Sequence, residues 1–323
     1  MALPFPIKII KNKCEDLLPF TNIYKPIFII APPRSGSTFL FECLIQFKEL
    51  YHISYEADLI WWRQFPYERM KDPSDFVGSD EASRLNISKH KKAIRSRSVF
   101  NMLKLKPRSS ILPYFFGRSL RLIDKTIANC FHLEFIDRAF PDAQYIFLLR
   151  DPRAVISSML EGWDHTFKKP QLTPILKTLC NNRINHWSYP APPGWKEVVQ
   201  KQLPEICAWS WQKHIEYPLS FFQKKKSDVV IVRYEDLVAD PLSSIEKLSK
   251  RFALKFSKNV EKYLQSPKLS STTISKPGPE KWRKNRQNEI ESILPQIEKL
   301  STLIGYDFSL PKSSTSIVSK SLL

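Results

Sequence analysis

The feature that most constrains this chain is a local pattern that recurs along it: a short apolar run, a charged or polar turn, and then a helical pattern. The apolar runs lie at residues 27–31, 145–149 and 229–232. Continuous apolar runs of this length are typical of strands buried on both faces, as in a parallel sheet. We therefore expect an α/β protein with a three-layer, P-loop-like fold, in which a central parallel sheet is flanked by helices.

The helical patterns and the segments between them suggest one domain. We expect helices at about residues 37–47, 131–140, 152–160, 206–222, 241–252 and 286–304, the last with Ile290, Ile293, Leu294, Ile297, Leu300 and Ile304 on one face. Residues 67–110 and 163–195 are rich in polar residues and proline, so we expect insertions or substrate lids there rather than separate domains. The predicted core covers about residues 24–308, and we expect 309–323 to form a flexible tail.

Composition narrows the partners and the compartment. The chain has 323 residues, and its 50 Lys and Arg exceed its 32 Asp and Glu by 18, which favours anionic partners. We recognise no nucleic-acid readout module and do not expect nucleic acid to bind. Residues 1–20 contain neither a membrane-length apolar run nor a signal peptide, so we expect a cytoplasmic protein that can work at a membrane face. Five scattered cysteines predict free thiols, and the spacing of the six histidines predicts no metal site.

The turn after the first apolar run is suited to binding a phosphate. Its residues are Arg34, Ser35, Gly36, Ser37 and Thr38. A helix that begins here offers free backbone N–H groups, the positive end of its dipole and two hydroxyls. Glycine is scarce, with seven in the chain, and one stands where the backbone must approach the anion closely. The alternative is an ordinary strand-to-helix turn capped by serine.

The kind of phosphate follows from a comparison with the nucleotide-binding motif G-x-x-x-x-G-K-[ST]. Aligned with "APPRSGST", that motif has its lysine at Ser37. A turn without this lysine is poorly equipped to neutralise the charge of a triphosphate, so we disfavour an ATP-dependent kinase. A sulfuryl group carries a single negative charge, and an arginine, hydroxyls and a helix N-terminus could stabilise its in-line transfer without a metal.

A second motif gives the chain a resemblance to a known family. In "YIFLLRDPRAVISSML", Arg150 stands eight residues before Ser158. With "PPRSGSTFL", this resembles the sulfotransferases that use 3′-phosphoadenosine 5′-phosphosulfate (PAPS), and most of all their carbohydrate-type and bacterial members. The resemblance implies that Arg34 and its turn bind the 5′-phosphosulfate. It also implies that Arg150 and Ser158, with Ser157 as a substitute, bind the 3′-phosphate of PAPS and of its product PAP.

Two later segments extend the resemblance. "VRYEDLVADP" at residues 232–241 is similar to a family strand end whose tyrosine, here Tyr234, lies near the nucleotide. "SKPGPEKWRKN" at residues 275–285 has the position of the family's C-terminal cofactor loop, which implies nucleotide contacts from Lys276, Gly278, Lys281, Trp282 and Arg283. The alternative for this segment is a solvated basic loop around a buried tryptophan.

The base that accepts the proton of the acceptor hydroxyl has two candidates of equal rank. Residues 123–143 are similar to the "EKTPxN" stretch of carbohydrate-type members, which implies a base at Asp124 and an active-site lysine at Lys125. Glu56 is the rival, because family members place a catalytic acid after the first helix. Asp124 is one methylene shorter than the family's glutamate, and such a change can misplace a catalytic group. Each carboxylate could instead have a structural role.

The resemblance implies a hydroxyl acceptor, most readily on a carbohydrate or glycolipid. Tryptophans and tyrosines could form stacking walls for it, although such side chains are more often core; they are Trp61, Trp62, Trp163, Trp187, Tyr189 and Trp195. If the base has been lost, the alternative is a protein of the same fold that binds PAPS or PAP and serves as an interaction partner.

Overall fold

A five-stranded, wholly parallel sheet forms the centre of the protein. The computed structural model describes residues 22–53, 56–105, 119–168, 187–225, 229–275, 278 and 280–308. Within these ranges the strand order is β2-β3-β1-β4-β5, with β1 at Ile27–Ile30, β2 at Leu50–Tyr51, β3 at Arg121–Asp124, β4 at Gln144–Leu149 and β5 at Val229–Arg233. The expected α/β fold with a central parallel sheet between helices is confirmed.

The strand register brings the carboxyl ends of the central strands together. Ile30, the last residue of β1, pairs with Phe147 of β4, and Leu149 at the end of β4 pairs with Arg233 at the end of β5. On the other side of β1, Phe28 pairs with Asp124, the last residue of β3. The segments that follow β1, β3, β4 and β5 therefore start from one edge of the sheet.

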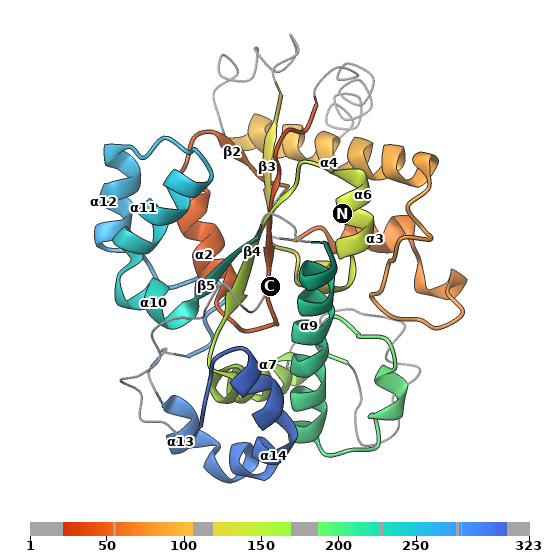
Figure 1. Ribbon diagram of the computed structural model, residues 1–323, viewed down its shortest axis with the longest axis vertical. Helices are drawn as coiled ribbons and strands as arrows, with labels where there is room; N and C mark the ends of the chain where they lie inside the picture. The colour runs from red at the N-terminus through yellow and green to blue at the C-terminus, as the bar shows by residue number, and fades with distance from the viewer. Residues whose placement is uncertain are drawn as a thin grey trace.

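Four helices cover one face of the sheet. They are α2 (Ser37–Leu44), α10 (Tyr234–Ala239), α11 (Pro241–Arg251) and α12 (Lys258–Gln265), to the left of the sheet in Figure 1. Each carries apolar residues on its inner side, and these pack against Ile29 of β1 and Ile146 of β4 in one buried cluster. Asp240 caps α11 by accepting a hydrogen bond from the backbone N–H of Ser243, and Pro241 follows it at a position that tolerates proline.

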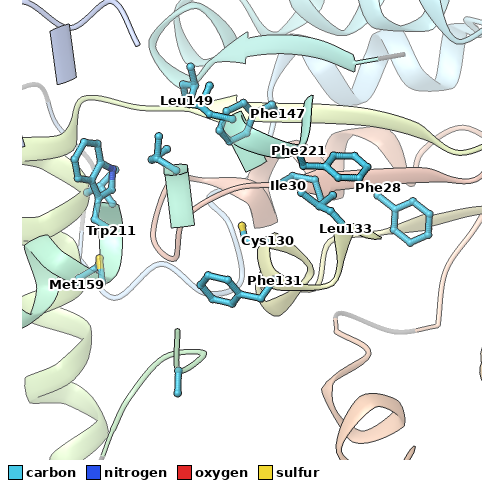
Figure 2. Close-up of a cluster of buried hydrophobic side chains, with 14 of the residues drawn as sticks. Phe28, Ile30, Cys130, Phe131, Leu133, Phe147, Leu149, Met159, Trp211 and Phe221 are labelled. Carbon is cyan, nitrogen blue, oxygen red and sulfur yellow. The ribbon is translucent and has the colours of Figure 1, made fainter. Parts of the chain in front are cut away.

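The larger core lies on the opposite face of the sheet. Its helices include α3 (Asp58–Gln64), α6 (Leu133–Ala139), α7 (Pro152–Lys168), α9 (Leu203–Lys225) and α14 (Gln287–Leu303). Figure 2 shows Phe28 and Ile30 of β1, Phe147 and Leu149 of β4, and Trp211 and Phe221 of α9 in this cluster. Burying one such side chain stabilises the fold by roughly 1.5–3 kcal/mol. This contact fixes α7 and α9, and α7 carries part of the site described below.

Three helical elements that the sequence did not predict follow α2. They are α3, the short 3-10 helix η1 (Tyr67–Arg69) and α4 (Arg84–Leu105), a 22-residue helix in the segment expected to be a lid. A second difference is α7, which continues past residue 160 to Lys168, and the missing side chain of Gly162 within it leaves room for the Tyr189 hydroxyl. The remaining elements are the 3-10 helices η3 (Ile127–Phe131) and η4 (Trp195–Glu197) and the short helix α13 (Lys281–Asn285).

The structure tests the expectation that the cysteines are free thiols. Cys43, Cys130 and Cys207 are buried free thiols, and burial raises the pKa of Cys43 to about 12. Such thiols are poor nucleophiles. Cys14, Cys180 and the expected tail at 309–323 lie outside the described residues.

Among the helices in the described ranges, none is long and apolar enough to cross a membrane.

Candidate active site

A cavity of about 730 Å³ opens at the carboxyl ends of the parallel strands. Its lining includes Arg34 after β1, Lys125 after β3, Arg150 after β4 and Tyr234 after β5. Ligand pockets in proteins usually have volumes of roughly 300–1,000 Å³. The cavity is thus large enough for a nucleotide, and it lies where open parallel sheets bind ligands.

The turn between β1 and α2 is held in an uncommon backbone conformation. Arg34 has φ 66° and Gly36 has φ 92°, both in the left-handed region. For a residue with a side chain this costs about 1 kcal/mol, so other contacts must hold Arg34 there. Arg150 supplies one, because its Nη1 donates a hydrogen bond to the Arg34 carbonyl oxygen over 3.0 Å.

The Arg34 side chain joins this turn to two other parts of the cavity. Its Nε donates to Ser158 Oγ on α7 over 3.2 Å, and its Nη1 donates to the carbonyl oxygen of Thr272 over 3.2 Å. Arg34, Arg150 and Ser158, far apart in the sequence, therefore form one connected group.

Gly36 packs closely against Tyr234. A Cβ atom added to Gly36 would lie 2.3 Å from two carbons of the Tyr234 ring, too close for any real contact. This ring also contacts Arg150, whose guanidinium carbon lies 4.4 Å from the ring centre. Only glycine suits this position, because it alone combines the positive φ with the missing side chain.

Serine and threonine line the start of α2. Ser37 and Thr38 are largely buried, yet both line the cavity. Ser35 is fully buried, and its Oγ has no hydrogen-bond partner among the described residues. The first N–H groups of a helix lack partners within the helix, so the start of α2 supplies donors and partial positive charge to this end of the cavity.

A loop at residues 270–275 forms one wall of the cavity and is tied to two helices. Ser271 donates to Glu42 of α2 from its Oγ over 2.7 Å. Ser275 Oγ donates to Glu161 Oε1 of α7 over 2.5 Å, and Lys281 Nζ pairs with Glu161 Oε2 at 3.0 Å. Burial alone would raise the pKa of Glu161, but the bonds from Ser275 and Lys281 lower it below its usual range. Glu161 thus stays ionised and holds the loop.

Glu56 and Lys125 form an ion pair at the cavity wall. Lys125 Nζ lies 2.5 Å from Glu56 Oε1, and both residues line the cavity. The two side chains differ in exposure, since 34% of the Glu56 side chain is accessible and only 3% of that of Lys125. The lysine therefore approaches the carboxylate from inside the protein and leaves part of the carboxylate open to the cavity.

Asp58 lies beside this pair and also lines the cavity. Burial, reinforced by the nearby Glu56 carboxylate, raises the pKa of Asp58 well above its usual range. Two carboxylates this close do not both ionise readily. Burial and the neighbouring carboxylate thus both favour the protonated form of Asp58.

Asp124 is enclosed by its own loop. Its Oδ1 accepts hydrogen bonds from Thr126 Oγ1 over 2.8 Å and from the Thr126 backbone N–H over 3.2 Å, and its Oδ2 accepts one from Asn129 Nδ2 over 2.7 Å. The residue is 2% exposed and is not part of the cavity lining. Burial raises its pKa, and the hydrogen bonds oppose that rise. Of the two base candidates, Glu56 faces the cavity and Asp124 does not.

The wall around Asp75 joins three segments. Asp75 Oδ1 accepts from Tyr67 Oη over 2.6 Å and from Trp62 Nε1 over 3.2 Å, while its Oδ2 accepts from the backbone N–H of Ala191 over 2.6 Å. Trp62 and Tyr189 line the cavity here. The other tryptophans expected as stacking walls are buried in the core: Trp61, Trp163, Trp187 and Trp195.

Most residues predicted from the sequence meet in this cavity. Those that line it are Arg34, Gly36, Ser37, Thr38, Glu56, Lys125, Arg150, Ser157, Ser158, Tyr234, Gly278 and Lys281. Trp282 is buried against the Arg153 guanidinium, and Arg283 is exposed and pairs with Glu280. Neither of these two lines the cavity, and Lys276 lies outside the described residues.

Two acidic residues of the lining were not predicted from the sequence. Glu161 lies three residues after Ser158 on α7, so helical spacing puts it on the same face, and this signal could have found it. Asp58 lies two residues after Glu56, but a second acid so close in a sequence does not reveal which one faces a ligand.

The charges and hydroxyls suit an anionic ligand at the α2 end of the cavity. Arg34, Arg150 and Lys281 supply positive charge, and Ser37, Thr38 and Ser158 supply hydroxyl groups. This donor set is typical of phosphate and sulfate recognition. Within the described part of the chain, no group of three or more His, Cys, Asp or Glu side chains is arranged to hold a metal ion.

Known protein families and solved structures resemble this chain to different degrees. Residues 26–258, more than half of the chain, match a family model described as the sulfotransferase family. A search of curated proteins found no match. Among solved structures, a sulfotransferase from Mycobacterium avium is 14% identical, with 92% of this chain and 80% of that chain covered and a TM-score of 0.49.

Two more solved structures are similar to the chain, again with low sequence identity and a low TM-score. A sulfotransferase from Alicyclobacillus acidocaldarius is 16% identical, with 89% of this chain and 98% of that chain covered and a TM-score of 0.45. A mouse sulfotransferase complexed with PAP is 14% identical, with 83% and 73% covered and a TM-score of 0.39. The family assignment depends on the family model and not on these structures.

Replacing Gly36 by alanine tests the contact with Tyr234. We expect Gly36→Ala to lose anion binding, because the new Cβ would push the Tyr234 ring and the turn apart. Gly194→Ala is the matched control, since Gly194 also has a positive φ, 81°, but only the flexible Glu197 side chain lies near its added Cβ.

Both variants should lose about 1 kcal/mol of stability from the left-handed backbone. Thermal unfolding and binding of PAP, measured by calorimetry, check the expectation. Equal PAP binding by both variants would contradict a tight Gly36–Tyr234 contact at the ligand site.

Proposed function

Because a family model matches residues 26–258, this chain belongs to the sulfotransferase family, and we propose that it uses PAPS as its sulfuryl donor and a hydroxyl group of a carbohydrate or glycolipid as its acceptor. The observation that carries the proposal is the joining of both predicted phosphate-binding motifs in one cavity. Arg150 bonds the Arg34 carbonyl, and Arg34 bonds Ser158. A donor with phosphates at its 5′ and 3′ positions needs such a pair of neighbouring anion sites.

The residues present fit PAPS. Arg34, Ser37, Thr38 and the start of α2 would hold the 5′-phosphosulfate, where the Gly36 backbone allows close approach. Arg150 and Ser158, with Ser157 beside them, would hold the 3′-phosphate, and the bond to Arg34 uses only part of the donor capacity of Arg150. Tyr234, Gly278 and Lys281 would complete this end of the site.

When bound, PAPS supplies the sulfuryl group and leaves as PAP. Glu56 is the base in this proposal, and it accepts the proton of the acceptor hydroxyl through the part of its carboxylate open to the cavity. Lys125 holds the other side of that carboxylate. Arg34 stabilises the negative charge on the leaving phosphate. Both carboxylate oxygens of Asp124 already accept hydrogen bonds, from Thr126 and from Asn129, so we do not propose Asp124 as the base.

The cavity lining also suits a hydroxyl-rich acceptor. Trp62 and Tyr189 offer aromatic surface, while Glu56 and Asp58 offer oxygen atoms. Sugar rings combine apolar faces with hydroxyl donors, so this mixture supports a carbohydrate or glycolipid. A cytoplasmic location, expected from the sequence, is also part of the proposal.

The first measurement is isothermal titration with PAP and, beside it, with adenosine 5′-phosphate, which lacks the 3′-phosphate. We expect a clear preference for PAP that disappears in Arg150→Ala, because that variant loses the cation that we propose holds the 3′-phosphate. Arg69→Ala is the control, since it removes the same charge from an exposed position outside the cavity lining. Equal binding of both nucleotides to the unmodified protein would contradict the PAPS assignment.

Arg34→Ala tests charge stabilisation during transfer. Loss of one preorganised donor typically lowers kcat by about a hundred- to a thousand-fold, and we expect that loss here. Alanine meets the same backbone cost at φ 66°, so the variant loses only the hydrogen bonds from Arg34 to Ser158 and Thr272, and we expect it to stay folded and to unfold at a somewhat lower temperature. Transfer from labelled PAPS to a panel of sugars and alcohols measures the effect. Near-normal turnover would remove Arg34 from the catalytic residues.

Glu56→Gln tests the base. We expect kcat to fall by about a hundred- to ten-thousand-fold while the dissociation constant of PAP stays the same, because Glu56 lies on the acceptor side of the site. Glu298→Gln makes the same chemical change at an exposed position of α14 and should leave turnover intact. The same labelled-transfer assay and PAP titration serve both variants. Unchanged turnover in Glu56→Gln would show that the proton goes elsewhere.

A further inference from the structure

The buried contacts behind Glu56 connect it to Asp124. Ala57, the residue after Glu56, donates its backbone N–H to Thr126 Oγ1 over 2.6 Å. Thr126 in turn donates its hydroxyl proton to Asp124 Oδ1 over 2.8 Å. A hydroxyl has one proton, so giving it to Asp124 leaves the Thr126 oxygen as the acceptor that the Ala57 N–H needs. The direction of both bonds is therefore set by the carboxylate.

The same residues determine where Lys125 stands. Lys125 lies between Asp124, the last residue of β3, and Thr126, whose backbone N–H donates to Asp124 Oδ1 over 3.2 Å. Both members of the ion pair thus have a chain neighbour that takes part in this network: Ala57 for Glu56 and Thr126 for Lys125.

From these contacts we propose that Asp124 and Thr126 form a buried clamp that positions the Glu56 carboxylate for proton transfer. Asp124 is then a positioning residue and not the base. The inference rests on the proposed function, in which Glu56 is the base. It gives a role to the motif residue Asp124, whose carboxylate does not reach the cavity lining.

Burial makes the clamp hard to replace. Thr126 is fully buried and Ala57 is 1% exposed, so water does not reach either partner of their hydrogen bond. Ala57 also caps α3, because its carbonyl oxygen accepts from the backbone N–H of Ile60 over 2.7 Å. Losing the Thr126 hydroxyl would free the N-terminal side of α3 together with Glu56.

Three substitutions separate the clamp from other roles. Thr126→Val keeps the shape of the side chain but removes the hydroxyl. Thr126→Ser keeps the hydroxyl and should restore the clamp. Asp124→Asn keeps an oxygen that can accept a hydrogen bond from Thr126. The new amide group faces Asn129, which can match it by rotating its own amide so that its oxygen accepts and its NH2 group turns to His132. The neutral imidazole of His132 can supply an acceptor nitrogen for that NH2 group.

The first readout is independent of activity. Hydrogen exchange at the Ala57 amide, followed by NMR of the full chain labelled with ¹⁵N-alanine, reports the bond to Thr126. We expect Thr126→Val to speed this exchange by about tenfold, the factor that corresponds to one lost hydrogen bond, and Thr126→Ser to leave it nearly unchanged. An unchanged Ala57 exchange rate in Thr126→Val would overturn the clamp.

The second readout is a cycle with Glu56→Gln, using transfer from labelled PAPS and titration with PAP. We expect Thr126→Val alone to lower kcat by about ten- to a hundred-fold without changing PAP affinity, since misplacing a catalytic group by about 1 Å has effects of this size. In the Glu56→Gln background the same change should lower kcat no further. A full additional loss there would overturn the proposal, because Thr126 would then act on something other than Glu56.

Asp124→Asn keeps the proposal testable even if Thr126→Val does not fold. A positioning role predicts that kcat stays within about tenfold of the unmodified protein, whereas a base at Asp124 predicts a fall of about a hundred- to ten-thousand-fold. The larger fall would overturn the proposal. If the unmodified protein neither binds PAP nor transfers a sulfuryl group, the proposed function fails, and Ala57 exchange alone then decides whether the clamp exists.

Discussion

The parallel pairing of β3, β1, β4 and β5 is the constraint on which the rest of the structure depends. Because parallel strands end at one edge of the sheet, the loops that follow them must meet there. The segments that follow the strands supply Arg34, Lys125, Arg150 and Tyr234 to one cavity. The same pairing sets Asp124 beside Phe28 at the end of β3, where Thr126 and Asn129 enclose its carboxylate while the next residue, Lys125, reaches the cavity.

The strands and helices that could be predicted are those with a strong local pattern. β1, β4 and β5 are continuous apolar runs, and α14 has an apolar stripe that is buried at Ile290, Ile293 and Ile297. β3 escaped prediction because its four residues begin and end with charged side chains. α4 was missed because polar side chains, among them His90 and Ser98, occupy buried positions of that helix and hide its periodicity.

The site residues that could be predicted also lie within a strong local pattern, and those that could not depend on contacts between distant parts of the chain. The turn at Arg34 and the pair Arg150 and Ser158 were recognisable because each lies within one strand–turn–helix unit. The choice between Glu56 and Asp124 was not recognisable, since it depends on a contact between Glu56 and Lys125, which stand 69 residues apart. A sequence pattern does not tell which of two carboxylates faces a cavity and which one is consumed by internal hydrogen bonds.

Asp75 has a consequence for how an acceptor would bind. By accepting hydrogen bonds from Tyr67, Trp62 and the Ala191 backbone, its carboxylate cross-links three segments of the cavity wall through non-covalent bonds. A wall fixed in this manner has little conformational entropy left to lose when a molecule enters. Selection among acceptors at this end of the site would then depend on shape and hydrogen-bond match with a rigid surface, as in lock-and-key recognition, rather than on folding of the wall around its guest.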